Sequence, residues 1–240
     1  MAILIVVAGL HFFLQPPPFA PQEESAQEKT WLEKKYGQKL YSQHNEELII
    51  RDFFQDRKNG FFVDVGASHY RINSTTFFLE KHLGWRGIAV DALSKYATGY
   101  IKNRKNTRYY IFFVSDKSDN EVEFYINIQN DRVSSGNIDF AKRYGEYEKV
   151  KVPTITLDDL LEHSQVHKID FLSMDIELAE PAALAGFDIQ KFRPQLVCIE
   201  AHPEVLSQLL EYFERNNYKI IEKYIGMDPL NLYFTPKEPS

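Results

Sequence analysis

Acidic side chains and one histidine stand directly after several apolar segments of this sequence. Asp64 lies near the end of the apolar run 61–65, and Asp91 ends the run 85–91. The full set is Asp64, Asp91, Ser115, Asp116, Asp175, Glu177, Glu180, Glu200 and His202. Groups of these types that meet in one crevice can hold ribose hydroxyls, bind a cation or accept a proton during catalysis. Whether they meet depends on the elements that carry them.

The stretch 61–80 is typical of a strand, a tight loop and a helix. An apolar run ends in an Asp-x-Gly sequence that begins at Asp64, a short polar loop follows, and Asn73 or Ser74 is placed to cap an amphipathic helix. This order is the first half of a nucleotide-binding βαβ unit. Asp91 ends the second apolar run, where such folds hydrogen-bond a ribose.

Further strands and helices alternate along the chain. After one or two helices within 31–54, we expect strands over 61–67, 85–91, 109–114, 121–126, 150–157, 169–175, 195–200, 218–223 and 232–234, and helices over 93–103, 157–163, 181–187 and 204–216. Thr156 is a candidate helix cap, and the polar stretch 129–148 is expected to be a long loop. This alternation predicts an α/β domain with a mostly parallel sheet, whose ligands bind at the carboxyl ends of the strands.

Composition limits the classes of function. The chain has 240 residues, 44% of them hydrophobic, which is enough for one packed domain and does not require two. A net charge of -6 argues against nucleic acid as the main partner, because phosphate binding needs a basic face. The single cysteine, Cys198, permits no disulfide framework, so we expect a reducing, cytoplasmic compartment. Its apolar neighbours favour a buried structural thiol over a reactive one.

The N-terminal segment differs from the rest of the chain. Residues 1–14 are apolar except for His11, and three prolines follow at 16–18. The apolar run is shorter than the roughly 20 residues of a spanning helix, and it lacks the basic start of a signal peptide. We interpret it as a membrane anchor or its remnant; a weak signal sequence, a mistaken start site and a disordered tail are alternatives. One domain is expected over 23–240.

Each of these candidate site residues, taken alone, could instead have a purely structural role. Asp116 and Glu180 could cap turns or helices, Asp64 could accept backbone N–H groups of its own loop, and His202 could cap the helix that follows it. The carboxyl ends of parallel strands meet at one edge of a sheet, however, and these residues should share that edge. Their convergence favours a functional site.

Five segments in this order resemble the FkbM family of S-adenosylmethionine-dependent methyltransferases. They are FVDVGA at 62–67, NSTTFFLEK at 73–81, GWRGIAVD at 84–91, TLDDLL at 156–161 and IDFLSMDIELAE at 169–180, and the resemblance covers about residues 41–234. It implies the class I methyltransferase fold, a Rossmann-like seven-stranded sheet with its last strand antiparallel and helices on both faces. We expect N-terminal helices over 28–57 and this core over 60–236, after an apolar segment and Pro-rich linker over 1–22. The implied activity is O-methylation of a hydroxyl on a sugar, lipid or small metabolite, so the expected partner is a small-molecule or glycan acceptor.

The resemblance also implies residue roles. Around the cofactor it places Asp64, Gly66 and Ala67 at the methionine end, Asp91 at the ribose, Ser115 and Asp116 beside the adenine, and Asp175, Glu177 and Glu180 on the methyl-transfer side. The candidate catalytic residues are His202, Glu177 and Asp175. A histidine with an ordinary pKa of about 6.5 suits a general base.

A metal ion is the alternative way to ionise the acceptor hydroxyl. Asp175 and Glu177 should end one strand, with Glu200 and His202 at the end of its neighbour. Mg²⁺ held by Asp175, Glu177 and Glu200 would relieve the repulsion between these carboxylates. We favour metal-free base catalysis here, because histidine is a poor partner for Mg²⁺.

Two positions depart from the family pattern. Tyr70 and Leu178 stand where glycine is usual, and a leucine that needs a positive φ costs about 1 kcal/mol or more. These changes favour an alternative function, a catalytically impaired methyltransferase-like binding or scaffold protein. The retained Asp64, Asp91 and Asp175 oppose it. A nicotinamide-dependent enzyme is disfavoured because no Gly-x-Gly-x-x-Gly follows the first strand.

Overall fold

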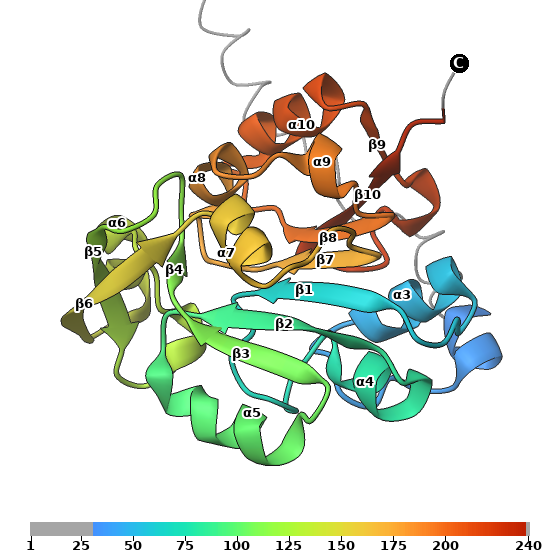
Figure 1. Cartoon of the computed structure of the whole chain (residues 1–240), viewed down its shortest axis with the longest axis horizontal. Helices are drawn as coiled ribbons and strands as arrows, with labels where there is room; N and C mark the ends of the chain where they lie inside the picture. The colour runs from blue at the N-terminus through green and yellow to red at the C-terminus, as the bar shows by residue number, and fades with distance from the viewer. Residues whose placement is uncertain (1–30, 239–240) are drawn as a thin grey trace, which may run out of the picture.

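A seven-stranded sheet forms the centre of the computed structural model, which describes residues 31–238 (Figure 1). Its strands, in spatial order, are β3 (Thr107–Ile111), β2 (Arg86–Asp91), β1 (Phe61–Val65), β7 (Phe171–Met174), β8 (Leu196–Glu200), β10 (Asn231–Pro236) and β9 (Tyr218–Ile220). The first five are parallel to one another, and β10 is antiparallel to both of its neighbours. The predicted mostly parallel sheet with an antiparallel last strand is confirmed.

The register of the parallel strands brings their carboxyl ends to one edge. Val65 of β1 is aligned with Val90 of β2 and with Met174 of β7, and Met174 is aligned with Ile199 of β8. The residues next along these four strands therefore lie along the same edge: Gly66, Asp91, Asp175 and Glu200. This is the edge on which the sequence predicted the functional residues to converge.

Helices cover both faces of the sheet (Figure 1). On one face are α3 (Glu46–Phe54), α4 (Phe77–Leu83) and α5 (Ala97–Asn103), and on the other are α7 (Leu157–His163), α8 (Glu180–Ala185), α9 (Ile189–Phe192) and α10 (Leu206–Arg215). Residues 31–36 are also helical and precede α3. Each helix presents an apolar stripe to the sheet, as the spacing of hydrophobic residues predicts.

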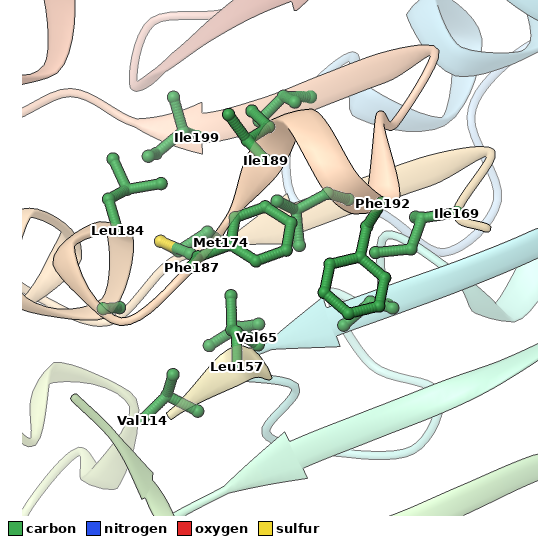
Figure 2. Close-up of a cluster of buried hydrophobic side chains, with 14 of the residues drawn as sticks. Val65, Val114, Leu157, Ile169, Met174, Leu184, Phe187, Ile189, Phe192 and Ile199 are labelled. Atoms are coloured by element: carbon green, nitrogen blue, oxygen red, sulfur yellow. The ribbon is translucent and has the colours of Figure 1, made fainter. Parts of the chain in front are cut away.

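The larger apolar cluster lies between the sheet and helices α7 to α10. Figure 2 shows its members Val65, Met174 and Ile199 among side chains from the helical layer, including Leu184 and Phe187. All five are less than a tenth exposed. Burying a side chain of this size contributes roughly 1.5–3 kcal/mol, so this cluster fixes the ends of the strands that carry the carboxylates.

A second, three-stranded sheet lies beside the first and differs from expectation. It contains β4 (Phe113–Val114), β6 (Tyr147–Ile155) and β5 (Glu121–Asn127), in the order β4–β6–β5. The segment 109–114, predicted as one strand, is therefore two: β3 ends at Ile111, and β4 pairs with β6 instead. The change of partner depends on a strand about forty residues further along the chain, which local sequence does not reveal.

The polar stretch 129–148 is not the loop that was predicted. It contains η2 (Asp131–Val133), α6 (Ile138–Ala141) and η3 (Lys142–Tyr144). Asn137 caps α6, because its side chain accepts the N–H groups of Asp139 and Phe140. Phe140 is 1% exposed and anchors the segment.

Other elements agree with the sequence more closely. Thr156 caps α7, with its hydroxyl accepting the N–H of Asp159 at 3.1 Å, and the helix has its predicted bounds. Cys198 is buried, as expected. Helix α4 begins later than predicted, although Ser74 does accept the N–H of Phe77 at 3.1 Å. Among the described residues no helix is long and apolar enough to cross a membrane; the run 1–14 lies outside them.

Candidate active site

Two adjoining cavities open at the edge where the parallel strands end. The narrow cavity, of about 50 Å³, lies against the ends of β1 and β2 and the segment around β4. The acidic cavity, of about 270 Å³, lies over the ends of β7 and β8. Both are lined by Gly66, Ser68, Arg132, Asp175 and Glu177. Groups bound in the two cavities would therefore meet at these five residues.

The narrow cavity has a carboxylate at one side and an apolar wall at the other. Asp91 accepts the N–H of Ser68 at Oδ2 and the N–H of Leu93 at Oδ1, both at 2.8 Å. Burial raises the pKa of the Asp91 carboxyl to about 6. The apolar wall comprises Leu93, Tyr96, Phe112, Phe113 and Phe124. A hydrogen-bond acceptor facing an aromatic slot suits the ribose and base of a nucleoside.

Ser115 and Asp116, which were expected beside the adenine, line neither cavity. The N–H of Ser115 donates to the carbonyl of Ile155 in the small sheet at 3.0 Å, and Asp116 is exposed. Ser115 and Asp116 lie outside the cavities because β3 ends early, at Ile111. Phe112 and Phe113 therefore take the position next to Asp91. The aromatic residues at 109, 110, 112 and 113 are the sequence signal for such a wall, but they are equally typical of a buried strand.

A glycine is required at position 66, because the loop after β1 passes very close to the loop after β7. Its φ is +80°, and a Cβ at this position would lie 1.8 Å from the backbone oxygen of Asp175. Ala67, also expected at the cofactor, is buried and accepts the hydroxyl of Tyr100 at its carbonyl at 3.1 Å. Ser68 follows with a φ of 45°, and its Oγ is buried without a hydrogen-bond partner among the described residues. Ser68, which lines both cavities, therefore carries an unsatisfied polar atom.

Asp64 is held by a side chain rather than by its own loop. It is 5% exposed, and its Oδ2 accepts the hydroxyl of Thr76 at 2.7 Å. Arg104 donates to the same hydroxyl oxygen at 3.1 Å and pairs with Glu80. Burial raises the pKa of Asp64 to about 6. Asp64 lines the acidic cavity.

The structure brings together the acids and the histidine that were predicted to end β7 and β8. His202 Nε2 donates to Glu177 Oε2 at 3.2 Å. The same nitrogen lies 3.1 Å from Glu200 Oε2, but that oxygen is buried and has no hydrogen-bond partner of suitable geometry among the described residues. A single N–H can point well at only one of the two carboxylates.

This crowding shifts the pKa values of His202, Glu180 and Asp175. The hydrogen bond to Glu177 and the contact with Glu200 raise the pKa of His202 to about 10, so that its imidazolium form dominates at neutral pH. Burial raises the pKa of Glu180, which is fully buried, to about 7. Asp175 lines both cavities. The surrounding protein excludes water from its carboxyl, and this loss of hydration, together with repulsion from Glu200 and Glu177, raises its pKa well above the ordinary value.

The two departures from the family pattern have different structural consequences. Glu177 and Leu178 both have left-handed backbones, with φ of 54° and 74°, so this turn does require the conformation that glycine adopts most readily. The hydroxyl of Ser135 braces it by donating to the carbonyl of Glu177 at 2.6 Å. Tyr70 is not in the left-handed region, and its ring packs against Gly99, so tyrosine is accommodated there.

The strand order and the antiparallel last strand define a class I methyltransferase fold. Residues 64–220 match the family model described as the Methyltransferase FkbM domain. The chain belongs to this family and is an S-adenosylmethionine-dependent methyltransferase. No curated protein sequence matches the chain.

Several solved structures are similar to the chain. A TehB-like SAM-dependent methyltransferase from Corynebacterium glutamicum is 13% identical with a TM-score of 0.47, and the match covers 89% of this chain and 97% of that one. Fibrillarin from Aeropyrum pernix, with natively bound S-adenosyl-L-methionine, is 12% identical over 75% of this chain and 68% of its own, with a TM-score of 0.44. The 1,6-didemethyltoxoflavin-N1-methyltransferase of Burkholderia thailandensis, with bound S-adenosylhomocysteine, is 14% identical over 94% of each chain, with a TM-score of 0.41.

Proposed function

We propose that the protein transfers a methyl group from S-adenosylmethionine to a hydroxyl oxygen of a sugar, a lipid or a small metabolite. The observation that carries this proposal is that the narrow cavity and the acidic cavity share walls at Gly66, Asp175 and Glu177. The first cavity suits the nucleoside of the cofactor, and the second is lined by polar groups that can bind hydroxyls. Family membership supports the methyl-transfer chemistry.

The residues present fit the cofactor. Each carboxylate oxygen of Asp91 accepts one backbone N–H and can accept a further hydrogen bond from a ribose hydroxyl. The unpartnered Oγ of Ser68 is available to a polar group of the ligand. The aromatic wall of the narrow cavity would pack on the adenine, and Asp64 and Gly66 would lie near the methionine part. When bound, S-adenosylmethionine supplies an electrophilic methyl group on a sulfonium.

The chain's own contribution is to orient the acceptor and receive its proton. Orientation of two reactants can account for a large part of such a rate enhancement. We assign the role of general base to Glu177, because it lines both cavities, whereas His202 lines only the acidic one. His202 holds the Glu177 carboxylate through its hydrogen bond, and its raised pKa suits this positioning role better than that of a free base.

Cofactor binding is tested by replacing Asp91. We expect Asp91→Ala to weaken S-adenosylmethionine binding by about ten-fold or more in calorimetry, since a charged hydrogen-bond partner contributes about 1.5–3 kcal/mol. Asp116→Ala is the matched control, because Asp116 is exposed and lines neither cavity. Thermal unfolding of both variants checks that the fold is intact. Equal affinities of the two variants would remove Asp91 from the cofactor site.

Methyl transfer is tested with S-adenosylmethionine labelled in its methyl group. The acceptors to be screened are hydroxylated sugars, lipids and small metabolites. On a substrate so found, Glu177→Gln should lower kcat by about 10²-fold or more, because general base catalysis typically contributes that much, and should leave cofactor affinity unchanged. Tight cofactor binding without turnover of any acceptor would instead support the binding or scaffold function, which the strained turn at Leu178 favours.

A further inference from the structure

We propose that Glu177, Glu200 and His202 form a binding site for one divalent transition-metal ion. The ion would be held at the ends of β7 and β8, on the wall of the acidic cavity. This ligand set differs from the all-carboxylate Mg²⁺ set considered from the sequence, because His202 replaces Asp175. The inference does not rest on the proposed methyl acceptor, and its test requires no methyl donor.

The spacing of the three side chains is that of ligands on a common ion. One ligand atom from each residue lies within 4.8 Å of the others. His202 Nε2 is 3.2 Å from Glu177 Oε2 and 3.1 Å from Glu200 Oε2. With metal–ligand bonds of about 2.1 Å, neighbouring ligand atoms lie about 3.0–3.4 Å apart in octahedral and tetrahedral geometries. Two sides of the triangle therefore already have the separation that coordination requires.

An unsatisfied oxygen points to a missing ligand. Glu200 is 5% exposed, and its Oε2 is buried without a hydrogen-bond partner among the described residues. The N–H of His202 cannot satisfy Glu177 and Glu200 together, as its single hydrogen bond to Glu177 shows. A cation between the three side chains would bind both carboxylates and the imidazole nitrogen at once.

The local charge also favours a cation. Glu177 and Glu200 contact the imidazole of His202. Asp175 and Glu180 lie near enough for their charges to act on Glu200, and carboxylates that ionise here repel one another. A divalent ion that binds here would displace the proton of the His202 imidazolium into solvent. The ion, two carboxylates and the neutral imidazole then form a locally neutral set. Imidazole among the donors favours Mn²⁺ or Zn²⁺ over Mg²⁺, which prefers oxygen ligands alone.

The three ligands are held in position before any ion arrives. Glu200 ends β8 and is paired in register with Asn231 of β10. The turn that carries Glu177 is braced by the hydroxyl of Ser135. The ring of Phe140 packs edge-on against His202, with 5.4 Å between the ring centroids. Rigid support of this kind is typical of built metal sites.

The experiment is a titration of the full chain with Mn²⁺ after a chelator has been used and removed, read by calorimetry and by electron paramagnetic resonance. We expect saturable binding of one Mn²⁺ per chain, displaced by Zn²⁺ and much less readily by Mg²⁺. Pulsed resonance of the wild-type complex should show the nitrogen coupling of a coordinated imidazole. This readout needs no variant, and its absence in the saturated complex would overturn the assignment.

Variants locate the ion. Glu200→Gln and His202→Ala should weaken Mn²⁺ binding by at least about ten-fold, since even outer-shell changes typically cost that much. Glu204→Gln is the matched control, because Glu204 is exposed, lies two residues from His202 and pairs with Arg143 instead. Equal Mn²⁺ affinity in the Glu200 and Glu204 variants, or no saturable binding in the wild type, would reject the site. Calorimetry with S-adenosylmethionine on the metal-free protein reports separately on the proposed function.

Discussion

Glu46, the first residue of α3, is a buried acid that lines neither cavity. It is 5% exposed, and its Oε2 accepts the N–H of His44 at 2.6 Å. Burial, with repulsion from Asp228, raises its pKa from 4.5 to about 7. The folded state therefore binds this proton more tightly than the unfolded state does. The associated stability is complete below pH 4.5 and is lost as the pH rises to about 7.

Glu46→Gln should remove this pH dependence. Glutamine keeps an oxygen that can accept the N–H of His44 but does not ionise. The quantity to compare is the free energy of unfolding of the variant minus that of the wild type. We expect this difference to be larger at pH 8 than at pH 5, by on the order of 2 kcal/mol, because only the wild type loses stability as Glu46 ionises. Urea denaturation at both pH values measures it. A difference that stays the same at both values would show that Glu46 ionises at its ordinary pKa in the folded protein.

Several residues that line the cavities could be predicted individually, because the ends of strands are recognisable in the sequence. Asp91 and the groups around Glu177 and Glu200 follow apolar runs, and parallel strands end at one edge. Arg132 and the unpartnered hydroxyl of Ser68 were missed. Arg132 reaches the cavities from a segment that was predicted to be a loop, and the state of Ser68 follows from a backbone φ that residue type does not specify.

At the scale of elements, the C-terminal end of α9 carries a measurable strain. The helix ends at Phe192, and its C-cap is Arg193, whose φ of 41° is left-handed and whose side chain is exposed. Arg193→Gly should raise the free energy of unfolding by about 0.5 kcal/mol, because relief of the left-handed strain exceeds the entropy that glycine adds to the unfolded chain. Urea denaturation tests this.

A matched change inside a helix should have the opposite sign. Gln208 is exposed within α10, and Gln208→Gly should lower the free energy of unfolding by about 1 kcal/mol. If both glycine variants were destabilised equally, the left-handed cap of α9 would carry no strain.

Elements that depend on local signals were the ones predicted well. Helix α7 was placed with both bounds because Thr156 supplies a cap and Leu157, Leu160 and Leu161 supply the apolar stripe. The break after Ile111 was missed because β4 takes its partner from β6, far along the chain. The aromatic wall of the narrow cavity depends on that break, and the same break leaves Ser115 and Asp116 outside the lining of both cavities.

At the scale of the whole molecule, cofactor binding should not require the N-terminal segment. Within residues 31–238, those that line the two cavities begin at Gln43. A chain that starts at Glu23 should therefore bind S-adenosylmethionine as tightly as the full chain in calorimetry. A large loss of affinity would show that residues before Glu23 contribute to the site.

The same pair of chains tests the role predicted for the apolar run 1–14, which lies outside the described residues. If it is an anchor, the full chain should sediment with lipid vesicles, and the chain that starts at Glu23 should stay in solution. Finding both in the supernatant would exclude the anchor.

The place of β10 in the sheet has a consequence for biosynthesis. This strand lies between β8 and β9, pairs Asn231 with Glu200, and is preceded by Leu230, which lines the acidic cavity. A ribosome makes β8 first and reaches residue 231 only after about thirty more residues, at roughly 5–20 residues per second. Until then β8 lacks the antiparallel partner that β10 supplies. The acidic cavity is therefore completed late in synthesis, after the strands whose ends line the narrow cavity.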